Sequence, residues 1–249
     1  MDRRKLLSII IATYNAEKTL QRCLDSIIVQ KSEEVELIII DGGSTDNTVS
    51  IIKRNLKIID YWISEKDKGI YDAWNKGIDK ANGRWIQFVG SDDFILPDAL
   101  VDYLEFIKKT NTSGIDLITA RVRIVNNKGN FIRNYGYPFV WEKCRKFMIS
   151  PHPSILHSRY LFEEVGKYNI SYKSAGDTEL IYRKGKYLKT LFFNKEIIQF
   201  QIGGTSFSIK GLKESFNCRK EHKTVPIILN WFIYIKGIVS LYLKKILWK

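Results

Sequence analysis

The stretch from Asp67 to Asp93, DKGIYDAWNKGIDKANGRWIQFVGSDD, limits the possible folds of this chain more than any other. Apolar residues recur in it with the 3.6-residue period of a helix, at Ile70, Ala73, Trp74, Gly77, Ile78 and Ala81. Asn82-Gly83 predicts the end of that helix, with Gly83 in the left-handed conformation. The apolar run from Trp85 to Val89 barely alternates, which indicates a strand buried on both faces. The stretch therefore predicts an α/β fold.

Two adjacent carboxylates, Asp92 and Asp93, follow that strand directly. In open α/β sheets, ligands bind at the carboxyl ends of the parallel strands. Because neighbouring carboxylates repel each other, they are best tolerated where a hard divalent cation neutralises them. The pair predicts a cation site at the sheet edge. The alternative is that both residues only cap the helix predicted to begin at Pro97.

Strand and helix patterns alternate through the first 93 residues. Buried strands are predicted over 6–12, 35–40 and 58–63, and Asn15 is predicted to cap the helix after the first of them. Short connections in such an alternation specify a parallel sheet with right-handed crossovers. Three strand ends, at residues 13–15, 41–46 and 91–93, are therefore expected to open on one crevice.

The second half of the chain has a weaker pattern. Strands predicted over 116–124 and 130–135 flank a hairpin turn at 126–129, and two more strands are predicted over 188–193 and 196–202. His152, held between Pro151 and Pro153, either lines an acceptor pocket or only packs, and packing is favoured.

Composition limits the compartment and the partners. The 249 residues and a hydrophobic fraction of 45% suit one α/β domain with a substantial core. Cys23, Cys144 and Cys218 match no zinc or CxxC pattern, so we expect free thiols in a reducing, cytoplasmic compartment. A net charge of +13 predicts attraction to an anionic membrane; nucleic acid is disfavoured because no basic-aromatic platform motif is present.

A basic amphipathic helical segment is predicted over 207–249, following a domain over 1–206. Residues 225–243 are apolar apart from Asn230, Lys236 and Ser240, and nine Lys or Arg accompany two Glu from Thr205 onward. The internal Lys and the distributed aromatic residues favour a helix lying in the membrane interface over one that spans the bilayer. We therefore expect a protein peripheral at the inner face of the cell membrane. The alternative is packing on its own core or, in a homodimer, on a second subunit.

Four motifs in order, SIIIATYNAEKTLQRCLDSI, ELIIIDGGSTDNT, SEKDKGIYDAWNKGI and FVGSDD, resemble those of glycosyltransferase family 2. The resemblance is close over roughly residues 5–110 and weaker to about residue 206. It implies a GT-A fold, with a Rossmann-like, mostly parallel sheet flanked by helices. It also implies inverting transfer of a sugar from a nucleotide diphosphate-sugar to an acceptor hydroxyl, helped by Mg²⁺ or Mn²⁺. By analogy, the acceptor would be a saccharide or lipid-linked saccharide in surface polysaccharide synthesis.

The resemblance also implies roles for single residues. Asp93 would hold the metal, and Asp177 would be the general base. The donor-binding set expected from the motifs and the crevice is Thr13, Tyr14, Asn15, Asp41, Asp67, Lys68, Asn75 and Asp92. Asp41 has the alternative role of a turn residue, and Asn75 that of fixing a nearby loop. Gly203–Ser206 resembles a loop that closes near the donor phosphates.

The segment around the predicted base departs from the family pattern. An aromatic residue usually follows the base, but Thr178 stands there. This leaves Glu179 as a competing base and leaves open that Asp177 only caps a helix. A catalytically inactive nucleotide-sugar-binding or assembly protein at the membrane is therefore an alternative. A metal-dependent nucleotidyltransferase is another, although the expected glycine-rich phosphate loop is missing from residues 9–15.

Overall fold

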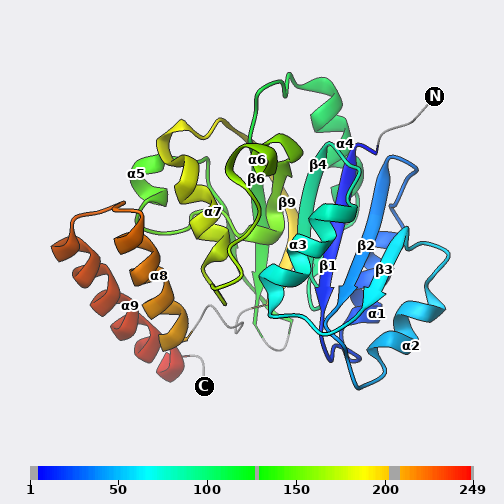
Figure 1. The fold of residues 1–249 in the computed structure, drawn as a ribbon, viewed down its shortest axis with the longest axis horizontal. Helices are drawn as coiled ribbons and strands as arrows, with labels where there is room; N and C mark the ends of the chain where they lie inside the picture. The colour runs from blue at the N-terminus through cyan, green and yellow to red at the C-terminus, as the bar shows by residue number, and fades with distance from the viewer. Residues whose placement is uncertain (1–4, 127–128, 202–207, 248–249) are drawn as a thin grey trace.

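The computed structural model describes residues 5–126, 129–201 and 208–247. They form one mixed sheet with helices on both faces and a pair of C-terminal helices at one end (Figure 1). Across the described ranges the strand order is β3-β2-β1-β4-β8-β6-β9-β5, with β7 paired to β6. The predicted α/β class is confirmed.

The N-terminal half is the predicted alternation of strands and helices. The strands are β1 (Leu7–Thr13), β2 (Val35–Asp41), β3 (Tyr61–Ser64) and β4 (Trp85–Gly90). The helices are α1 (Leu20–Ile28), α2 (Thr48–Arg54) and α3 (Ile70–Lys80). β1 lies between β2 and β4 and is parallel to both, with Thr13 opposite Asp41 and Ala12 opposite Gly90. The ends of β1, β2 and β4 therefore open on one edge of the sheet, as predicted.

The second half adds antiparallel strands. Its elements are β5 (Phe94–Ile95), α4 (Ala99–Lys109), β6 (Leu117–Val125), β7 (Phe131–Tyr135), α5 (Trp141–Cys144), β8 (Ile155–Ser158), α6 (Arg159–Val165), α7 (Gly176–Lys184) and β9 (Thr190–Gln201). The two strands predicted over 188–193 and 196–202 form the single strand β9. Irregular register around Arg121 lets β9 continue alongside β6. The predicted pair β6–β7 is antiparallel, although residues 127–128 of its turn lie outside the described ranges.

Each face of the sheet has its own hydrophobic core. Ile9 and Ile11 of β1 point into a core shared with α1, α2 and α4. Ile10, between them, points into a second core shared with α3, α6 and α7. Because side chains alternate along a strand, a strand covered on both faces has to be apolar throughout. This explains the continuous apolar runs that predicted β1, β2 and β4.

Two local predictions are wrong. Gly83 has no positive φ; it is required because a Cβ there would lie 2.5 Å from the backbone nitrogen of Ser8. Asn15 does not cap α1, which begins at Leu20. The backbone N–H of Ala16 is instead bound by the Thr48 hydroxyl, at 2.7 Å. The first residue of α2 thus binds the backbone just after Asn15.

The three cysteines are free and buried. Burial raises the pKa of Cys144 to about 11 and that of Cys218 to about 12. Free thiols were predicted from the spacing of these residues, and burial keeps them in the protonated, unreactive form.

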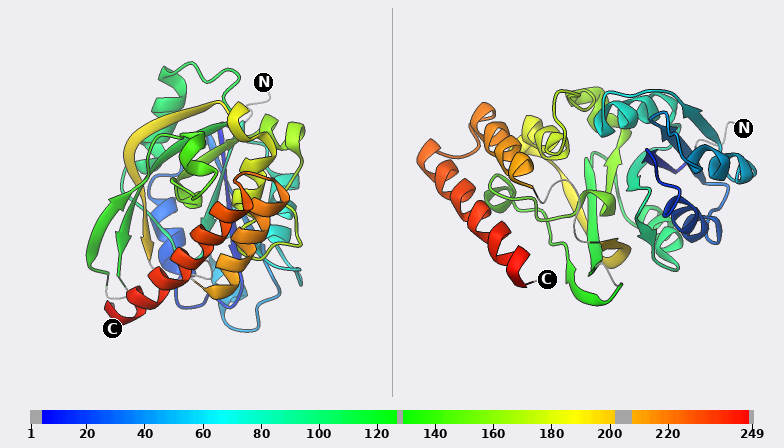
Figure 2. Two further views of the ribbon diagram at one scale, coloured as in Figure 1. Left: turned by 90° about the vertical axis from the view of Figure 1, so that its left-hand side faces the viewer. Right: turned by 90° about the horizontal axis from the view of Figure 1, so that it is seen from below.

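The C-terminal helices α8 (Ile209–Glu221) and α9 (Ile227–Leu247) pack against each other at the end of the molecule away from β3 (Figures 1 and 2). Asn230 is buried between them, accepting from Arg219 Nε (2.7 Å) and donating to the carbonyl of Phe216 (2.9 Å). Among the described helices none is long and apolar enough to cross a membrane. The domain boundary predicted at 206/207 falls next to residues 202–207, outside the described ranges, and stays a prediction.

Candidate functional site

The loops that follow β1 and β2 are joined by hydrogen bonds. Asn15 Oδ1 accepts from the backbone nitrogen of Thr45 (2.9 Å), and the backbone nitrogen of Asn15 donates to Ser44 Oγ (2.8 Å). Asp41 is fully buried, and its carboxylate accepts from the Ser44 nitrogen (2.9 Å) and from the Ser64 hydroxyl (2.6 Å). Asp41 therefore holds this loop in shape, the role named as its alternative. Its contact with a donor stays a prediction.

Tyr14, Gly42 and Asp67 meet at the mouth of the crevice. A Cβ on Gly42 would lie 2.5 Å from Asp67 Oδ2 and 3.5 Å from the Tyr14 ring, so glycine lets these side chains close in. The Tyr14 side chain is 63% exposed. Lys68 is exposed beside Asp67. At the end of β1, Thr13 Oγ1 is buried and has no hydrogen-bond partner among the described residues. The edge thus presents an aromatic face, a carboxylate, a cation and an unused hydroxyl.

The carboxylates of Asp92 and Asp93 converge on Gly90 but differ in exposure. Asp93 is buried and its Oδ2 accepts from the Gly90 nitrogen at 2.8 Å, whereas Asp92 is exposed. A Cβ on Gly90 would lie 2.8 Å from Asp92 Oδ1 and 3.1 Å from Asp93 Oδ2. Burial, with the charge of Asp92 adding to it, raises the pKa of Asp93 to about 7. The N-cap of α4 is Asp98, so the alternative in which this pair caps that helix is wrong.

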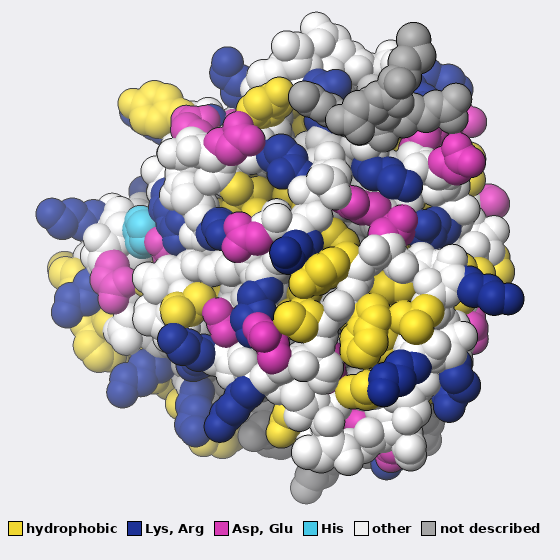
Figure 3. Space-filling model, turned by 45° about the vertical axis from the view of Figure 1, so that its right-hand side comes forward, with side chains coloured by type: hydrophobic (Ala, Val, Ile, Leu, Met, Phe, Trp, Pro, Cys, Tyr) yellow, Lys and Arg dark blue, Asp and Glu magenta, His cyan; other side chains and the backbone are white. Residues whose placement is uncertain are grey.

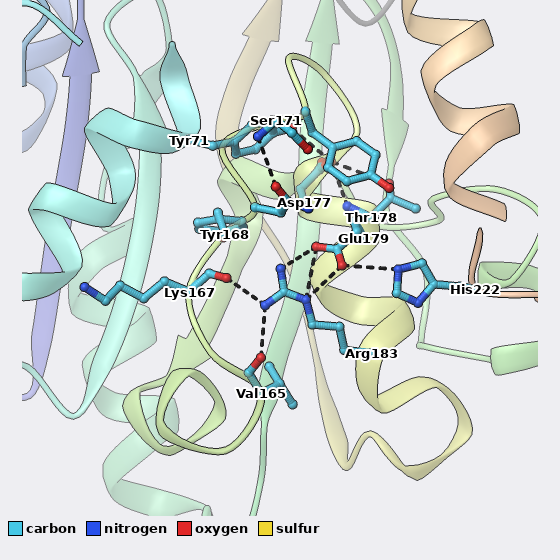
Figure 4. A network of polar contacts seen from close by, with 12 residues as sticks. Tyr71, Val165, Lys167, Tyr168, Ser171, Asp177, Thr178, Glu179, Arg183 and His222 are labelled. Carbon is cyan, nitrogen blue, oxygen red and sulfur yellow. Dashed lines mark hydrogen bonds and ion pairs between the residues drawn. The ribbon is translucent and has the colours of Figure 1, made fainter. Parts of the chain in front are cut away.

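Asp177 lies in the first turn of α7 and faces Tyr71 of α3 (Figure 4). Its Oδ1 accepts from the Thr178 nitrogen (2.8 Å) and from the Tyr71 hydroxyl (3.4 Å). Burial raises the pKa of Asp177 to about 6, because these hydrogen bonds offset only part of the desolvation. A carboxylate with a pKa near neutrality is suited to taking up a proton.

Glu179, the competing base, is part of a buried ion pair. Its two oxygens accept from Arg183 Nε at 2.9 and 3.1 Å, and Oε1 lies 3.2 Å from His222 Nε2 of the segment after α8 (Figure 4). Arg183 also donates to the carbonyls of Val165 (3.0 Å) and Lys167 (2.6 Å). With both oxygens engaged, Glu179 ties α7 to its neighbours. This geometry favours Asp177 over Glu179 as a base.

A family model described as glycosyl transferase family 2 matches residues 8–168. The chain belongs to this family. The PGL/p-HBAD biosynthesis glycosyltransferase of Mycobacterium bovis (strain BCG / Pasteur 1173P2) is 33% identical over 213 residues, which cover 82% of this chain and 80% of that protein. The chain is therefore a glycosyltransferase of family 2, as the motifs predicted.

Solved structures show the same fold as this glycosyltransferase. S. aureus TarS 1–349 in complex with UDP-GlcNAc has a TM-score of 0.69 at 18% identity, covering 94% of this chain and 71% of that one. The mannosyltransferase PcManGT from Pyrobaculum calidifontis, in complex with GDP-Man and Mn²⁺, has a TM-score of 0.68 at 14% identity, covering 97% and 75%. At these identities the likeness concerns the fold, which confirms the predicted GT-A type of mixed, mostly parallel sheet.

Asp92 and Asp93 fit a divalent ion of the kind predicted. Within the described ranges, His, Cys, Asp and Glu side chains form no group of three or more that could hold a metal by itself. Mg²⁺ in nucleotide sites typically takes one or two protein carboxylates and fills its other positions with phosphates and water. A cation beside Asp93 would also offset the burial and the repulsion that raise its pKa. Asp92 and Asp93 could thus supply the protein ligands of such an ion, and the metal site itself stays a prediction.

Three other predicted positions have separate outcomes. The Asn75 amide donates to the carbonyl of Tyr168 (2.8 Å) and accepts from its nitrogen (2.9 Å), so it fixes the segment before α7, and its donor contact stays a prediction. His152 packs, as favoured: its ring stacks on Trp74 with centroids 4.5 Å apart. The predicted loop Gly203–Ser206 lies outside the described residues.

Two residues of the site, Tyr71 and Glu214, were not predicted. The sequence carried a signal for Tyr71, because its spacing to Trp74 and Ile78 is helical. In the structure Tyr71 is buried, whereas Ile70 is 41% exposed. The apolar face of α3 is therefore the predicted one, except that Tyr71 takes the buried place expected of Ile70. Glu214 accepts hydrogen bonds from residues 39 to 41 positions earlier, a contact for which no local pattern exists.

Proposed function

We propose that this glycosyltransferase moves a sugar, with inversion at the anomeric carbon, from a nucleoside diphosphate-sugar to a hydroxyl of a saccharide acceptor. The observation that carries this proposal is the chain of contacts that links the acidic strand end to the base. Asp92 and Asp93 follow β4, which is paired to β1. The Asp67 side chain contacts Gly42 in the loop after β2. The backbone carbonyl of the next residue, Lys68, accepts from Lys173 Nζ at 2.5 Å, and Lys173 lies four residues before Asp177 in the chain.

The donor would lie across the ends of β1, β2 and β4. The exposed ring of Tyr14 offers a flat face for the base of the nucleotide, and the unpaired hydroxyl of Thr13 a hydrogen bond. Asp92, which is exposed, would bind the ribose hydroxyls. Asp67 and Lys68 flank the same opening. The resemblance to complexes with UDP-GlcNAc and with GDP-Man supports a nucleotide-sugar as the ligand.

Asp93, with Asp92 beside it, would hold Mg²⁺ or Mn²⁺ between the strand end and the diphosphate. When bound, the ion supplies Lewis-acid stabilisation of the charge on the departing diphosphate. The Mn²⁺ in the GDP-Man complex of the mannosyltransferase supports this choice of ion.

Asp177 would act on the acceptor. Its carboxylate takes the proton of the acceptor hydroxyl while that oxygen attacks the anomeric carbon from the face opposite the diphosphate. The new glycosidic bond forms as the bond to the phosphate oxygen breaks, and the electron pair leaves with the nucleoside diphosphate. The Tyr71 hydroxyl holds one carboxylate oxygen of Asp177, which fixes its orientation.

A lipid-linked saccharide in surface polysaccharide synthesis is the acceptor that the C-terminal helices favour. One side of α9 carries seven apolar residues that are each at least 51% exposed: Ile228, Trp231, Phe232, Ile235, Val239, Tyr242 and Leu243. A helix with such a face lies in the membrane interface, next to basic residues that meet anionic lipid. On the face shown in Figure 3, Lys and Arg are interspersed with Asp and Glu rather than gathered in one stripe. The face shown therefore has no basic stripe that would compete with the α9 face as the membrane contact.

The proposed reaction is tested with a panel of donors and acceptors. Purified protein is incubated with UDP- and GDP-sugars, octyl glycosides as acceptors, and either Mn²⁺, Mg²⁺ or EDTA. We expect metal-dependent release of nucleoside diphosphate, and a product whose anomeric proton shows by NMR the configuration opposite to that of the donor. Retention of configuration, or equal turnover in EDTA, would contradict the proposal.

Membrane binding is tested by cosedimentation with vesicles. The protein is expected to bind vesicles that contain phosphatidylglycerol, more weakly at high salt. The double change Phe232→Glu and Ile235→Glu should weaken this binding by about 100-fold or more, since each buried apolar side chain contributes roughly 1.5–3 kcal/mol. Val101→Glu, at an exposed apolar position of α4, is the matched control and should bind like the wild type. If instead the double variant turned a dimer into a monomer and vesicles never bound, the α9 face would belong to a second subunit.

A further inference from the structure

Glu214 of α8 binds the segment that immediately precedes the proposed base. Its carboxylate accepts from three consecutive backbone nitrogens, those of Lys173 (2.7 Å), Ser174 (2.5 Å) and Ala175 (2.8 Å). It also accepts from the Ser174 hydroxyl at 2.7 Å. Consecutive N–H groups that converge on one anion form a rigid, charge-assisted arrangement.

These contacts hold the segment that leads into α7. The N-cap of that helix is Ala175, which has no side-chain hydrogen-bonding group, and its backbone N–H donates to Glu214. The N–H groups of Lys173 and Ser174, which also donate to Glu214, precede the helix. A carboxylate at a helix N-terminus is also favoured by the helix dipole. Within the first turn Asp177 itself accepts from the Thr178 nitrogen, so Glu214 fixes the entry to α7 rather than its first turn.

The segment that Glu214 binds lies next to Asp177 and is also tied to Lys68. Lys173 donates its backbone N–H to Glu214 and, through Nζ, binds the carbonyl of Lys68 at 2.5 Å. Two residues after Ala175, Asp177 meets the Tyr71 hydroxyl. Gly176, between them, packs so tightly that a Cβ would lie 2.8 Å from the Tyr71 ring. A shift of segment 173–175 would therefore move Asp177 directly.

We propose that Glu214 is the positioning residue for Asp177: it sets where the base stands and how far water reaches it. The proposal rests on the role of Asp177 given above. It assigns a part in the reaction to the C-terminal helices, which would otherwise serve only for packing and attachment.

Several charged or titratable groups surround Asp177, and Glu214 has to be separated from them. Tyr71 reaches it from α3, and Tyr168 lies near it in the segment after α6. Cys218 of α8 interacts with it electrostatically. On α7 itself Glu179 and Arg183 are paired with each other. The charge of Glu214 is felt at Tyr71, whose pKa it helps to raise. Among these groups Glu214 is the one bound to the backbone that carries Asp177.

The test is Glu214→Gln, which keeps the size but loses the charge and one acceptor oxygen. With a donor and an octyl glycoside that are turned over, we expect kcat to fall by about 10- to 100-fold, as for other small misplacements of reacting groups. The KM for the donor and the Mn²⁺-dependent binding of UDP or GDP should not change. The acid limb of the pH–rate profile should also move to lower pH, because burial is the main cause of the raised pKa of Asp177, and a displaced carboxylate that water reaches more easily has a pKa below about 6.

Two controls separate this proposal from its alternatives. Glu163→Gln makes the same chemical change at an exposed position of α6 and should leave kcat and the pH profile unchanged. Asp177→Asn tests the base itself: if it were as active as the wild type, the proposed function would be wrong whatever Glu214 does. If Asp177→Asn were inactive while Glu214→Gln kept the kcat and the acid limb of the wild type, the positioning role would be wrong. Should Glu214→Gln not fold, Ser174→Ala decides: removing one bond to Glu214 should move the acid limb in the same direction, and an unmoved limb would refute the proposal.

Discussion

Replacing Asp93 by alanine is expected to remove metal-dependent nucleotide binding and to lower sugar transfer by at least about 10³-fold. The reason is that a bound divalent ion contributes several kcal/mol of charge stabilisation at the departing diphosphate, and each 1.36 kcal/mol is a factor of about ten in rate. The fold should tolerate the change, because the burial that raises the pKa of Asp93 also disfavours its charged form in the absence of a cation.

Thermal denaturation with UDP or GDP, with and without Mn²⁺, measures this effect apart from turnover, since a ligand of the native state raises the midpoint. With nucleotide present, Mn²⁺ should raise the denaturation midpoint of the wild type. It should not raise the midpoint of Asp93→Ala. Asp25→Ala, an exposed carboxylate on α1, should behave like the wild type. Equal metal-dependent stabilisation of wild type and Asp93→Ala would show that the ion is held elsewhere.

Asp177→Asn is expected to lower kcat by ~10²–10⁴-fold, the usual loss when a general base is removed. Donor binding should stay the same, because Asp177 contacts Tyr71 of α3, whereas the proposed donor contacts lie at the ends of β1, β2 and β4. The exposed change Asp79→Asn, on α3, is the matched control.

The pH profile of the wild type should agree with this role. Burial raises the pKa of Asp177 to about 6, and a base works only when deprotonated. Activity should therefore be full above about pH 7 and should fall tenfold per pH unit well below pH 6. The residual activity of Asp177→Asn should not show this loss of activity at low pH. An Asp177→Asn variant with wild-type kcat and the same acid limb would exclude Asp177 as the base.

The first half of the fold could be predicted because its signals are local. Continuous apolar runs and helical spacing are set by burial on both faces of a parallel sheet, and β1, β2 and β4 lie where those patterns placed them. Boundaries were less certain: α1 begins at Leu20 rather than after Asn15, and the backbone nitrogen of Ala16, before the helix, donates to Thr48 of α2. Only tertiary contacts reveal such a partner.

The site was predictable where one stretch of sequence carries the chemistry. Asp92 and Asp93 are adjacent in the chain, and the strand before them places both at the sheet edge. The contacts of Asp177 and of the segment before it were not predictable. Tyr71 reaches Asp177 from a helix 106 residues earlier in the chain, and Glu214 reaches Lys173 and Ser174 from a helix about 40 residues later. The choice between Asp177 and Glu179 likewise depended on Arg183 and His222, whose approach no pattern indicates.

The most direct measurement is an anomalous difference map from a crystal soaked with MnCl₂ and a nucleoside diphosphate. A cation held by acidic side chains at the end of β4, and completed by the diphosphate, predicts a manganese peak in contact with the Asp93 carboxylate and with both phosphates. A diphosphate bound away from the ends of β1 and β4, or a manganese ion with no contact to Asp92 or Asp93, would contradict this account of the glycosyltransferase.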